Sequence, residues 1–141
     1  MSPPDSAVDV LLVGGGVASV RCARALRRHG FDGTILLVGS EGRIPYNRPP
    51  LSKELLRGDV PDELLDAEPL SWYGKRSVEL RMDATVVAIY PEMCRATLAD
   101  GAAVAFGRCL LATGAELRTL TVPGGSDALM LRTAADARRI R

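Results

Sequence analysis

The stretch Val8-Asp9-Val10-Leu11-Leu12-Val13-Gly14-Gly15-Gly16-Val17-Ala18-Ser19 decides the fold of this chain. A mostly apolar run ends at Val13 and predicts a buried strand, and three glycines then lead into a helical pattern. A helix N-terminus presents unpaired N–H groups and a partial positive charge, and a phosphate reaches them only where no Cβ intervenes. The stretch therefore predicts a strand, a glycine turn and a helix that hold the pyrophosphate of a dinucleotide.

The dinucleotide fingerprint departs from its usual form at two positions. Ser19 replaces the third glycine, and it is small enough to allow close packing of helix on strand. The acidic residue, Glu41, follows a second apolar strand at 34–38 and lies 27 residues after Gly14, against about 20 in the usual pattern. An ordinary strand-turn-helix is the alternative, but the order of strand, helix, strand and acid favours dinucleotide binding.

Composition places the chain among ordinary globular domains. It has 141 residues, of which 47% are hydrophobic and 25% charged, and this suffices for one domain with a sizeable core. The net charge of +1 gives no field that would favour nucleic acid or a membrane surface, so neither is expected as a partner. Four arginines on the first helix are expected to form its solvated face: Arg21, Arg24, Arg27 and Arg28.

Cysteine usage indicates a reduced, cytoplasmic protein without a metal site. Cys22, Cys94 and Cys109 are odd in number and widely spaced, so they predict neither a disulfide framework nor a zinc site. Residues 1–7 carry no basic residue and lack the charged start of a signal peptide. No apolar stretch approaches membrane-spanning length.

The middle of the chain predicts an irregular loop followed by short helices. Prolines and Asn47 exclude regular structure from 42–50. A short helix is expected over 51–56, closed by Gly58, and helical pieces are expected over 61–65 and 68–75. Trp72 and Tyr73 at the end of the last piece are expected to anchor the core.

From Val78 onward the pattern becomes that of β structure. Strands at 78–80, 85–90, 95–98 and 103–106, with a hairpin turn at Asp100-Gly101, predict a small antiparallel meander. A further strand at 108–112 ends at Thr113-Gly114, and another strand at 129–131 precedes a helix that starts at Ala134. The predicted fold class is α/β, a Rossmann-like domain with a central parallel sheet and a small antiparallel β-meander.

Four motifs stand in order along nearly the whole chain: VGGGVA at 13–18, PYNRPPLSK at 45–53, LLATGA at 110–115 and LRT at 131–133. The second is the most specific, because Arg48 and Lys53 are spaced around paired prolines. Together the motifs resemble the FAD-dependent NAD(P)H:ferredoxin reductase family, of the putidaredoxin, rubredoxin and dioxygenase reductase type. The resemblance implies a glutathione-reductase-like FAD domain, of which residues 1–141 are the N-terminal part.

The resemblance also implies a role for each motif residue. Gly14, Gly16 and Ala18 would face the FAD pyrophosphate, and Glu41 would accept both hydroxyls of the adenosine ribose. Lys53 would lie beside the isoalloxazine, where its charge stabilises the negative charge that reduction places on the ring, so its contribution is electrostatic and no residue acts as acid, base or nucleophile. The other implied cofactor-binding residues are Val17, Arg48, Val86, Ala112, Thr113, Gly114 and Arg132.

What the resemblance implies for the whole protein is an enzyme of electron transfer. NADH or NADPH would reduce FAD, and single electrons would pass to a ferredoxin-type iron–sulfur protein that serves a cytochrome P450 or a dioxygenase. No CxxxxC motif is present, which argues against disulfide reductase chemistry. Ser40 stands where some relatives carry the ribose acid, and Asn47 replaces a common acidic residue.

The chain carries one glycine turn, whereas this architecture needs a second to bind a nicotinamide dinucleotide as well as a flavin. We therefore expect a fragment of a longer reductase, in which the NAD-binding and C-terminal interface domains lie elsewhere, and little activity from this chain alone. The alternative is a truncated, non-enzymatic module that binds a flavin or nucleotide as a sensor or interaction partner.

Overall fold

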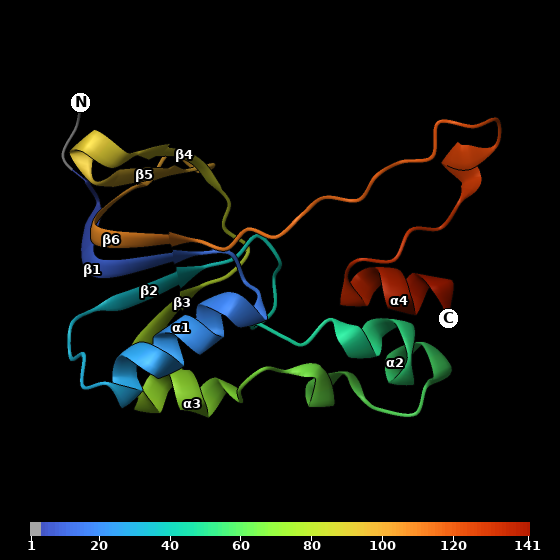
Figure 1. Cartoon of the computed structure of the whole chain (residues 1–141), viewed down its shortest axis with the longest axis horizontal. Coiled ribbons are helices and arrows are strands. Elements are labelled where there is room, and N and C mark those ends of the chain that lie inside the picture. Colours follow the sequence, from blue (N-terminus) through green and yellow to red (C-terminus); the bar gives the residue numbers. More distant parts are fainter. Residues whose placement is uncertain (1–3) are drawn as a thin grey trace. The chain divides into compact units, whose positions relative to one another are not determined.

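A computed structural model describes residues 4–141, which form two compact units (Figure 1). The sheet unit comprises 4–46 and 67–113, and the helical unit comprises 47–66 and 114–141. Part of the segment considered for a signal peptide, residues 1–3, lies outside the described residues.

A six-stranded mixed sheet forms the sheet unit, in the order β3-β2-β1-β6-β5-β4 (Figure 1). Its parallel part consists of β3 (Val78–Arg81), β2 (Ile35–Val38), β1 (Ser6–Val13) and β6 (Ala103–Leu111), and every neighbouring pair among these four runs in the same direction. The central parallel sheet predicted from the glycine-turn stretch is confirmed. The two helices of this unit are α1 (Val17–Arg28) and α3 (Leu70–Lys75).

An antiparallel meander completes the sheet, but the sequence-based prediction that the strand at 78–80 belongs to this meander was wrong. The meander consists of β4 (Val86–Tyr90), β5 (Arg95–Leu98) and the first part of β6, with a 3-10 turn, η3 (Pro91–Met93), between β4 and β5. Strand β3 pairs instead with β2, in parallel, because its alternate apolar residues Val78 and Leu80 pack with the β2 core.

Strand β6 is continuous through Gly107, although the sequence predicted two separate strands there. A Cβ at Gly107 would lie 2.9 Å from the Asp9 carbonyl oxygen, so glycine lets β6 approach β1 closely rather than ending the strand. The predicted hairpin turn is confirmed: Gly101 has a φ of 89° and its N–H donates to the Leu98 carbonyl.

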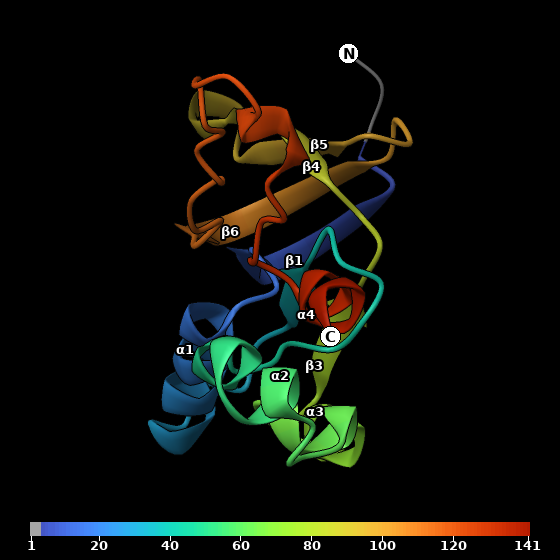
Figure 2. The same ribbon diagram turned by 90° about the vertical axis from the view of Figure 1, so that its right-hand side faces the viewer.

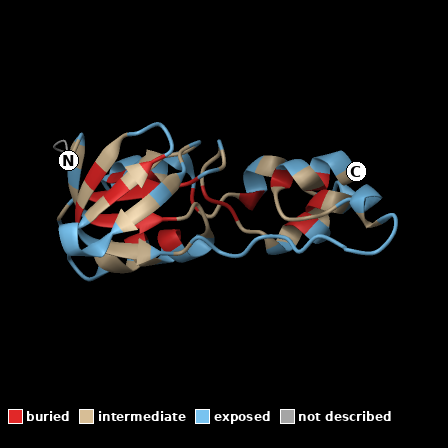
Figure 3. Ribbon diagram, turned by 90° about the horizontal axis from the view of Figure 1, so that it is seen from above, coloured by how far each residue is buried: buried red, intermediate tan, exposed pale blue. Residues whose placement is uncertain are grey.

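The core lies on both faces of the parallel strands, as the alternation of side chains requires. Figure 3 shows the buried residues along these strands in red. On one face Val10 and Leu12 pack with residues of α1, β2, β3 and α3, including the buried Tyr73. On the other face Leu11 and Val13 pack with Leu36, Val38 and the apolar residues of β5 and β6. Trp72 is half-buried against the first cluster, so the predicted anchoring role of this aromatic pair is confirmed.

Arg27 is the exception to the predicted solvated arginine face. Its guanidinium donates to four carbonyl oxygens, those of Phe31, Gly33, Arg76 and Ser77, at 2.7–2.9 Å. Arg21, Arg24 and Arg28 are exposed as expected. Arg27 therefore ties the end of α1 to the loop before β2 and to the end of α3.

The helical unit is built from short helices, visible in Figure 2. They are η1 (Pro49–Ser52), α2 (Glu54–Arg57), η2 (Asp62–Leu65), η4 (Gly125–Asp127) and α4 (Ala134–Ile140). The helix expected over 51–56 is thus two pieces, the first starting at Pro49, and Gly58 closes the second in the left-handed region. The strand expected at 129–131 is absent from the described structure, where side chains of Arg48 and Asp136 bind the Arg132 backbone.

Gly14 and Gly16 should differ sharply in their effect on folding. A Cβ at Gly14 would lie 2.6 Å from the Ala112 carbonyl carbon, and Gly14 has a φ of 122°, so we expect Gly14→Ala to destabilise the chain by about 3 kcal/mol. Gly16 has an extended backbone with no atom within 4 Å of a built Cβ, so Gly16→Ala should cost less than about 1 kcal/mol. Urea unfolding followed by circular dichroism measures both, and equal losses would contradict the assignment.

Candidate nucleotide-binding site

The glycine turn joins β1 to α1 and gives its first and third glycines different tasks. Gly14 is required by the fold, since its positive φ and close approach to Ala112 exclude a side chain. Gly16 is the N-cap of α1 with φ −101° and ψ 176°, a conformation that any residue adopts. A Cβ at Gly16 would enter open space at the start of the helix. The fold does not require glycine there, and the absent side chain leaves the backbone at the start of the helix open to approach.

The N-terminus of α1 is suited to an anion. In the described structure no side chain caps it and its first turn carries no acidic residue. Its leading N–H groups and the positive end of the helix dipole therefore remain available to a phosphate. Ser19, at the third glycine position, is fully buried, so the expectation that serine preserves the packing of this helix is confirmed.

Glu41 lies beyond the carboxyl end of β2, close in sequence to a tyrosine that fixes it. The Tyr46 hydroxyl donates to Oε2 of Glu41 at 2.7 Å, and Tyr46 itself is buried. The Arg43 guanidinium lies 4.6 Å from the centroid of the Tyr46 ring. Neither Tyr46 nor Arg43 was predicted from the sequence to take part in the site, although both fall within five residues of the acid. Their packing orients the Glu41 carboxylate at the end of the strand where α/β sheets bind ligands.

Residues 110–113 bring the end of β6 beside the glycine turn. The N–H of Ala112 donates to the Val13 carbonyl at 2.8 Å, and the N–H of Gly14 donates to the Val38 carbonyl at the same distance. Strands β6, β1 and β2 therefore end together, with Thr113 exposed after them. Val86 packs against the core cluster that contains Leu11 and Val13, and its contact with an adenosine remains a prediction.

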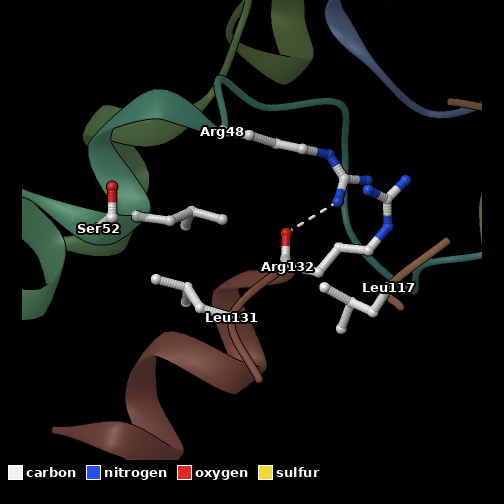
Figure 4. A pocket seen from close by; sticks show the side chains of 6 residues that line it. Arg48, Ser52, Leu117, Leu131 and Arg132 are labelled. Atoms are coloured by element: carbon white, nitrogen blue, oxygen red, sulfur yellow. Dashed lines mark hydrogen bonds between the residues drawn. The ribbon is translucent and has the colours of Figure 1, made fainter. Parts of the chain in front are cut away.

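In the helical unit, Arg48 and Arg132 lie together. Nη1 of Arg48 donates to the Arg132 carbonyl at 2.8 Å, and Figure 4 shows the two guanidinium groups side by side. They line a pocket of about 220 Å³ with Leu51, Ser52, Leu117 and Leu131. Two adjacent guanidinium groups repel each other, and a bound anion would offset this repulsion. The pair therefore suits a phosphate or another oxyanion.

Two other predicted site residues belong to the same unit. Gly114 has a φ of 78°, and a Cβ there would lie 3.0 Å from a guanidinium nitrogen of Arg132. Lys53 is exposed between η1 and α2. The fold of the helical unit thus brings together Arg48, Gly114 and Arg132, which come from three different sequence motifs. The position of Lys53 relative to a flavin remains a prediction.

Comparison with known proteins shows the family. The model of the family described as pyridine nucleotide-disulphide oxidoreductase matches residues 8–141, so the chain belongs to this family. Rhodocoxin reductase of Rhodococcus erythropolis is 39% identical over 132 residues, covering 92% of this chain and 31% of that protein. Rubredoxin-NAD(+) reductase of Pseudomonas putida is 34% identical over 134 residues, covering 94% of this chain and 35% of its own length.

Solved structures agree with this placement. The covalent complex of putidaredoxin reductase with putidaredoxin contains a chain with a TM-score of 0.86 and 35% identity, covering 98% of this chain and 34% of that one. The ferredoxin reductase from Rhodopseudomonas palustris gives a TM-score of 0.87 at 36% identity, and the match covers 96% of this chain and 33% of that one. The chain therefore spans about a third of the length of the relatives it matches.

The cysteines and the other potential metal ligands form no cluster in the part of the chain that the structure describes. Cys22, Cys94 and Cys109 are free thiols, and burial raises the pKa of Cys22 and Cys109. Within residues 4–141 no cluster of three His, Cys, Asp or Glu residues could hold a metal ion. Within the same residues no helix has the length and apolar character needed to cross a membrane.

Asp136 should make the capping of α4 depend on pH. Its carboxylate accepts from the N–H and hydroxyl of Thr133 and from the N–H of Arg132, and these bonds hold the pKa of Asp136 below its ordinary value. Because the folded pKa is lowered, the stabilisation is complete above the ordinary pKa of about 4 and is lost as the pH falls through and below it. We expect Asp136→Asn to weaken the chain at pH 7 and to reduce its pH dependence between pH 6 and 3. Urea unfolding measures this, with Asp127→Asn as the control that should leave the wild-type dependence intact.

Proposed function

We propose that the chain is the FAD-binding portion of a flavoprotein reductase, with residues 1–141 forming the N-terminal part of its FAD domain. Gly16 carries the proposal, because a glycine that the backbone does not need stands at an uncapped helix N-terminus. The FAD pyrophosphate fits there, where the N–H groups of Val17 and Ala18 open the helix. A side chain at Gly16 would fill the space that this phosphate takes.

The adenosine half of FAD suits the other groups at the carboxyl ends of the strands. The Glu41 carboxylate, oriented by Tyr46, accepts hydrogen bonds from the ribose hydroxyls. Ala112 and Thr113 follow the end of β6, where a small side chain, a hydroxyl and exposed backbone meet the ligand. These roles rest on the position of each residue at the end of its strand.

Residues of the helical unit supply positive charge in this proposal. Arg48 and Arg132 offer paired guanidinium forks to phosphate or flavin oxygens, and Gly114 leaves room beside Arg132. Lys53 supplies an ammonium charge at the flavin ring, a role supported by the motif resemblance.

For the whole protein we propose NAD(P)H:ferredoxin oxidoreductase activity. Bound FAD supplies the chemistry, since it accepts a hydride and releases electrons singly. The names of similar proteins support a ferredoxin-type iron–sulfur protein as electron acceptor: the anthranilate 1,2-dioxygenase system ferredoxin–NAD(+) reductase component of Burkholderia cepacia is 38% identical over 138 residues. An acceptor of this kind would serve a cytochrome P450 or a dioxygenase. We propose a cytoplasmic location, where the free thiols would stay reduced.

The pyrophosphate assignment predicts that Gly16→Val abolishes flavin retention. The branched side chain would occupy the phosphate position, while the extended backbone at Gly16 accepts valine with a stability loss of about 1 kcal/mol. Absorbance at the flavin band after purification of a full-length protein carrying this chain gives the flavin content. A folded Gly16→Val protein with the flavin content of the wild type would contradict the pyrophosphate assignment.

The Lys53 assignment predicts a change of potential rather than of folding. Lys53→Met keeps the length of an exposed side chain and removes its charge, so the flavin reduction potential should fall by about 20 mV while the unfolding midpoint changes little. Redox titration of the full-length flavoprotein measures the potential. Lys75→Met, a change of equal charge in the sheet unit, serves as control, and an unaltered potential in Lys53→Met would show that Lys53 is only a surface residue.

A further inference from the structure

A second cationic hollow lies in the sheet unit, where the C-terminal ends of α1 and α3 meet. It has a volume of about 310 Å³ and is lined by Arg24, Arg27, Arg28, Trp72 and Arg76, which we call the arginine pocket. The glycine turn lies at the opposite, N-terminal end of α1. The proposed cofactor function therefore uses none of these five residues.

Two of the four arginines are fixed in place by the protein. Arg24 forms an ion pair with the nearly buried Glu68 and lies 5.9 Å from the centroid of the Trp72 ring. Arg27 is held by its four carbonyl acceptors, which position its guanidinium without neutralising its charge. The nearby acids Asp32 and Glu79 line a separate pocket of about 200 Å³ that also touches Arg27.

The other two arginines carry charge that the described residues do not compensate. Across residues 4–141, the side chains of Arg28 and Arg76 make neither a hydrogen bond nor an ion pair. Helix C-termini attract cations, but Arg27 already binds the carbonyls of Arg76 and Ser77 at the end of α3, so that attraction does not require Arg76 as well. Three guanidinium groups, those of Arg27, Arg28 and Arg76, thus line one hollow, and the fourth lining arginine, Arg24, is paired with Glu68.

We propose that the arginine pocket binds a polyphosphate, either inorganic or the phosphate chain of a nucleotide. Guanidinium groups bind phosphate oxygens through paired, charge-assisted hydrogen bonds, and three of them match a ligand with several negative charges. The volume lies at the lower end of the range for small-molecule sites. A hollow of this size favours a compact anion over an acidic protein, which would meet a broad surface.

Trp72 makes the proposal directly testable, because it is the single tryptophan of the sequence and lines the pocket. Pyrophosphate is titrated into the 141-residue chain at physiological salt, with Trp72 fluorescence and isothermal titration calorimetry as independent readouts. We expect saturable binding, with orthophosphate at least about tenfold weaker because it carries less charge. An acidic peptide that binds more tightly than pyrophosphate would overturn the proposal in favour of protein docking.

Paired substitutions locate the bound anion. Arg28→Ala with Arg76→Ala removes two exposed pocket charges and should weaken pyrophosphate binding at least about tenfold. Arg21→Ala with Arg118→Ala removes two exposed charges outside the pocket and should change affinity less than about twofold. No saturable binding by either readout, or equal loss in both double variants, would overturn the proposal.

Further comparisons identify the source of the phosphate and separate this site from the glycine turn. Adenosine triphosphate binding as tightly as pyrophosphate supports recognition of the phosphates alone, and tighter binding supports a nucleotide. Gly16→Val should leave pyrophosphate binding to the pocket unchanged while it abolishes flavin retention. Pyrophosphate binding lost in Gly16→Val but kept in Arg28→Ala with Arg76→Ala would place the anion at the glycine turn and overturn the proposal.

Discussion

The close approach of Gly14 to the Ala112 carbonyl is the constraint on which the sheet unit depends. Only a residue without a Cβ allows the turn after β1 to lie against the end of β6, and the positive φ of Gly14 then directs the chain into α1. Because β1 lies between β2 and β6, this contact aligns the ends of all three strands. That alignment places Gly16 after β1 and Glu41 after β2 at the same edge of the sheet.

The alternation of β1 explains how these strand ends remain available. Val10 and Leu12 are buried against α1, α3 and the neighbouring strands, while Leu11 and Val13 are buried against β5 and β6. Both faces of the strand are therefore occupied by core, and the polar chemistry is left at the carboxyl ends. Stability and ligand binding are thus assigned to different parts of the same strand.

Arginine serves three distinct purposes in this chain. Arg27 is structural, since it binds four carbonyl oxygens at the ends of α1 and α3. Arg48 and Arg132 bring like charges together in the helical unit, an arrangement that an oxyanion would relieve. Arg28 and Arg76 direct charge at a hollow without a carboxylate partner among the described residues. The planar fork of the guanidinium group suits all three uses, whereas lysine would suit none equally well.

The sequence by itself determined the glycine turn, the parallel β-α-β unit and most helices, because glycine spacing, apolar periodicity and capping residues act locally. The partner of β3, the continuity of β6 through Gly107 and the absence of a strand at 129–131 in the described structure were decided by tertiary contacts. Strand pairing depends on which backbone groups meet in space, and residues far apart in the sequence decide that. Tertiary packing also brings Tyr46 to Glu41, and it gathers Arg28, Trp72 and Arg76 around one hollow. The sequence pattern does not reveal that these side chains meet.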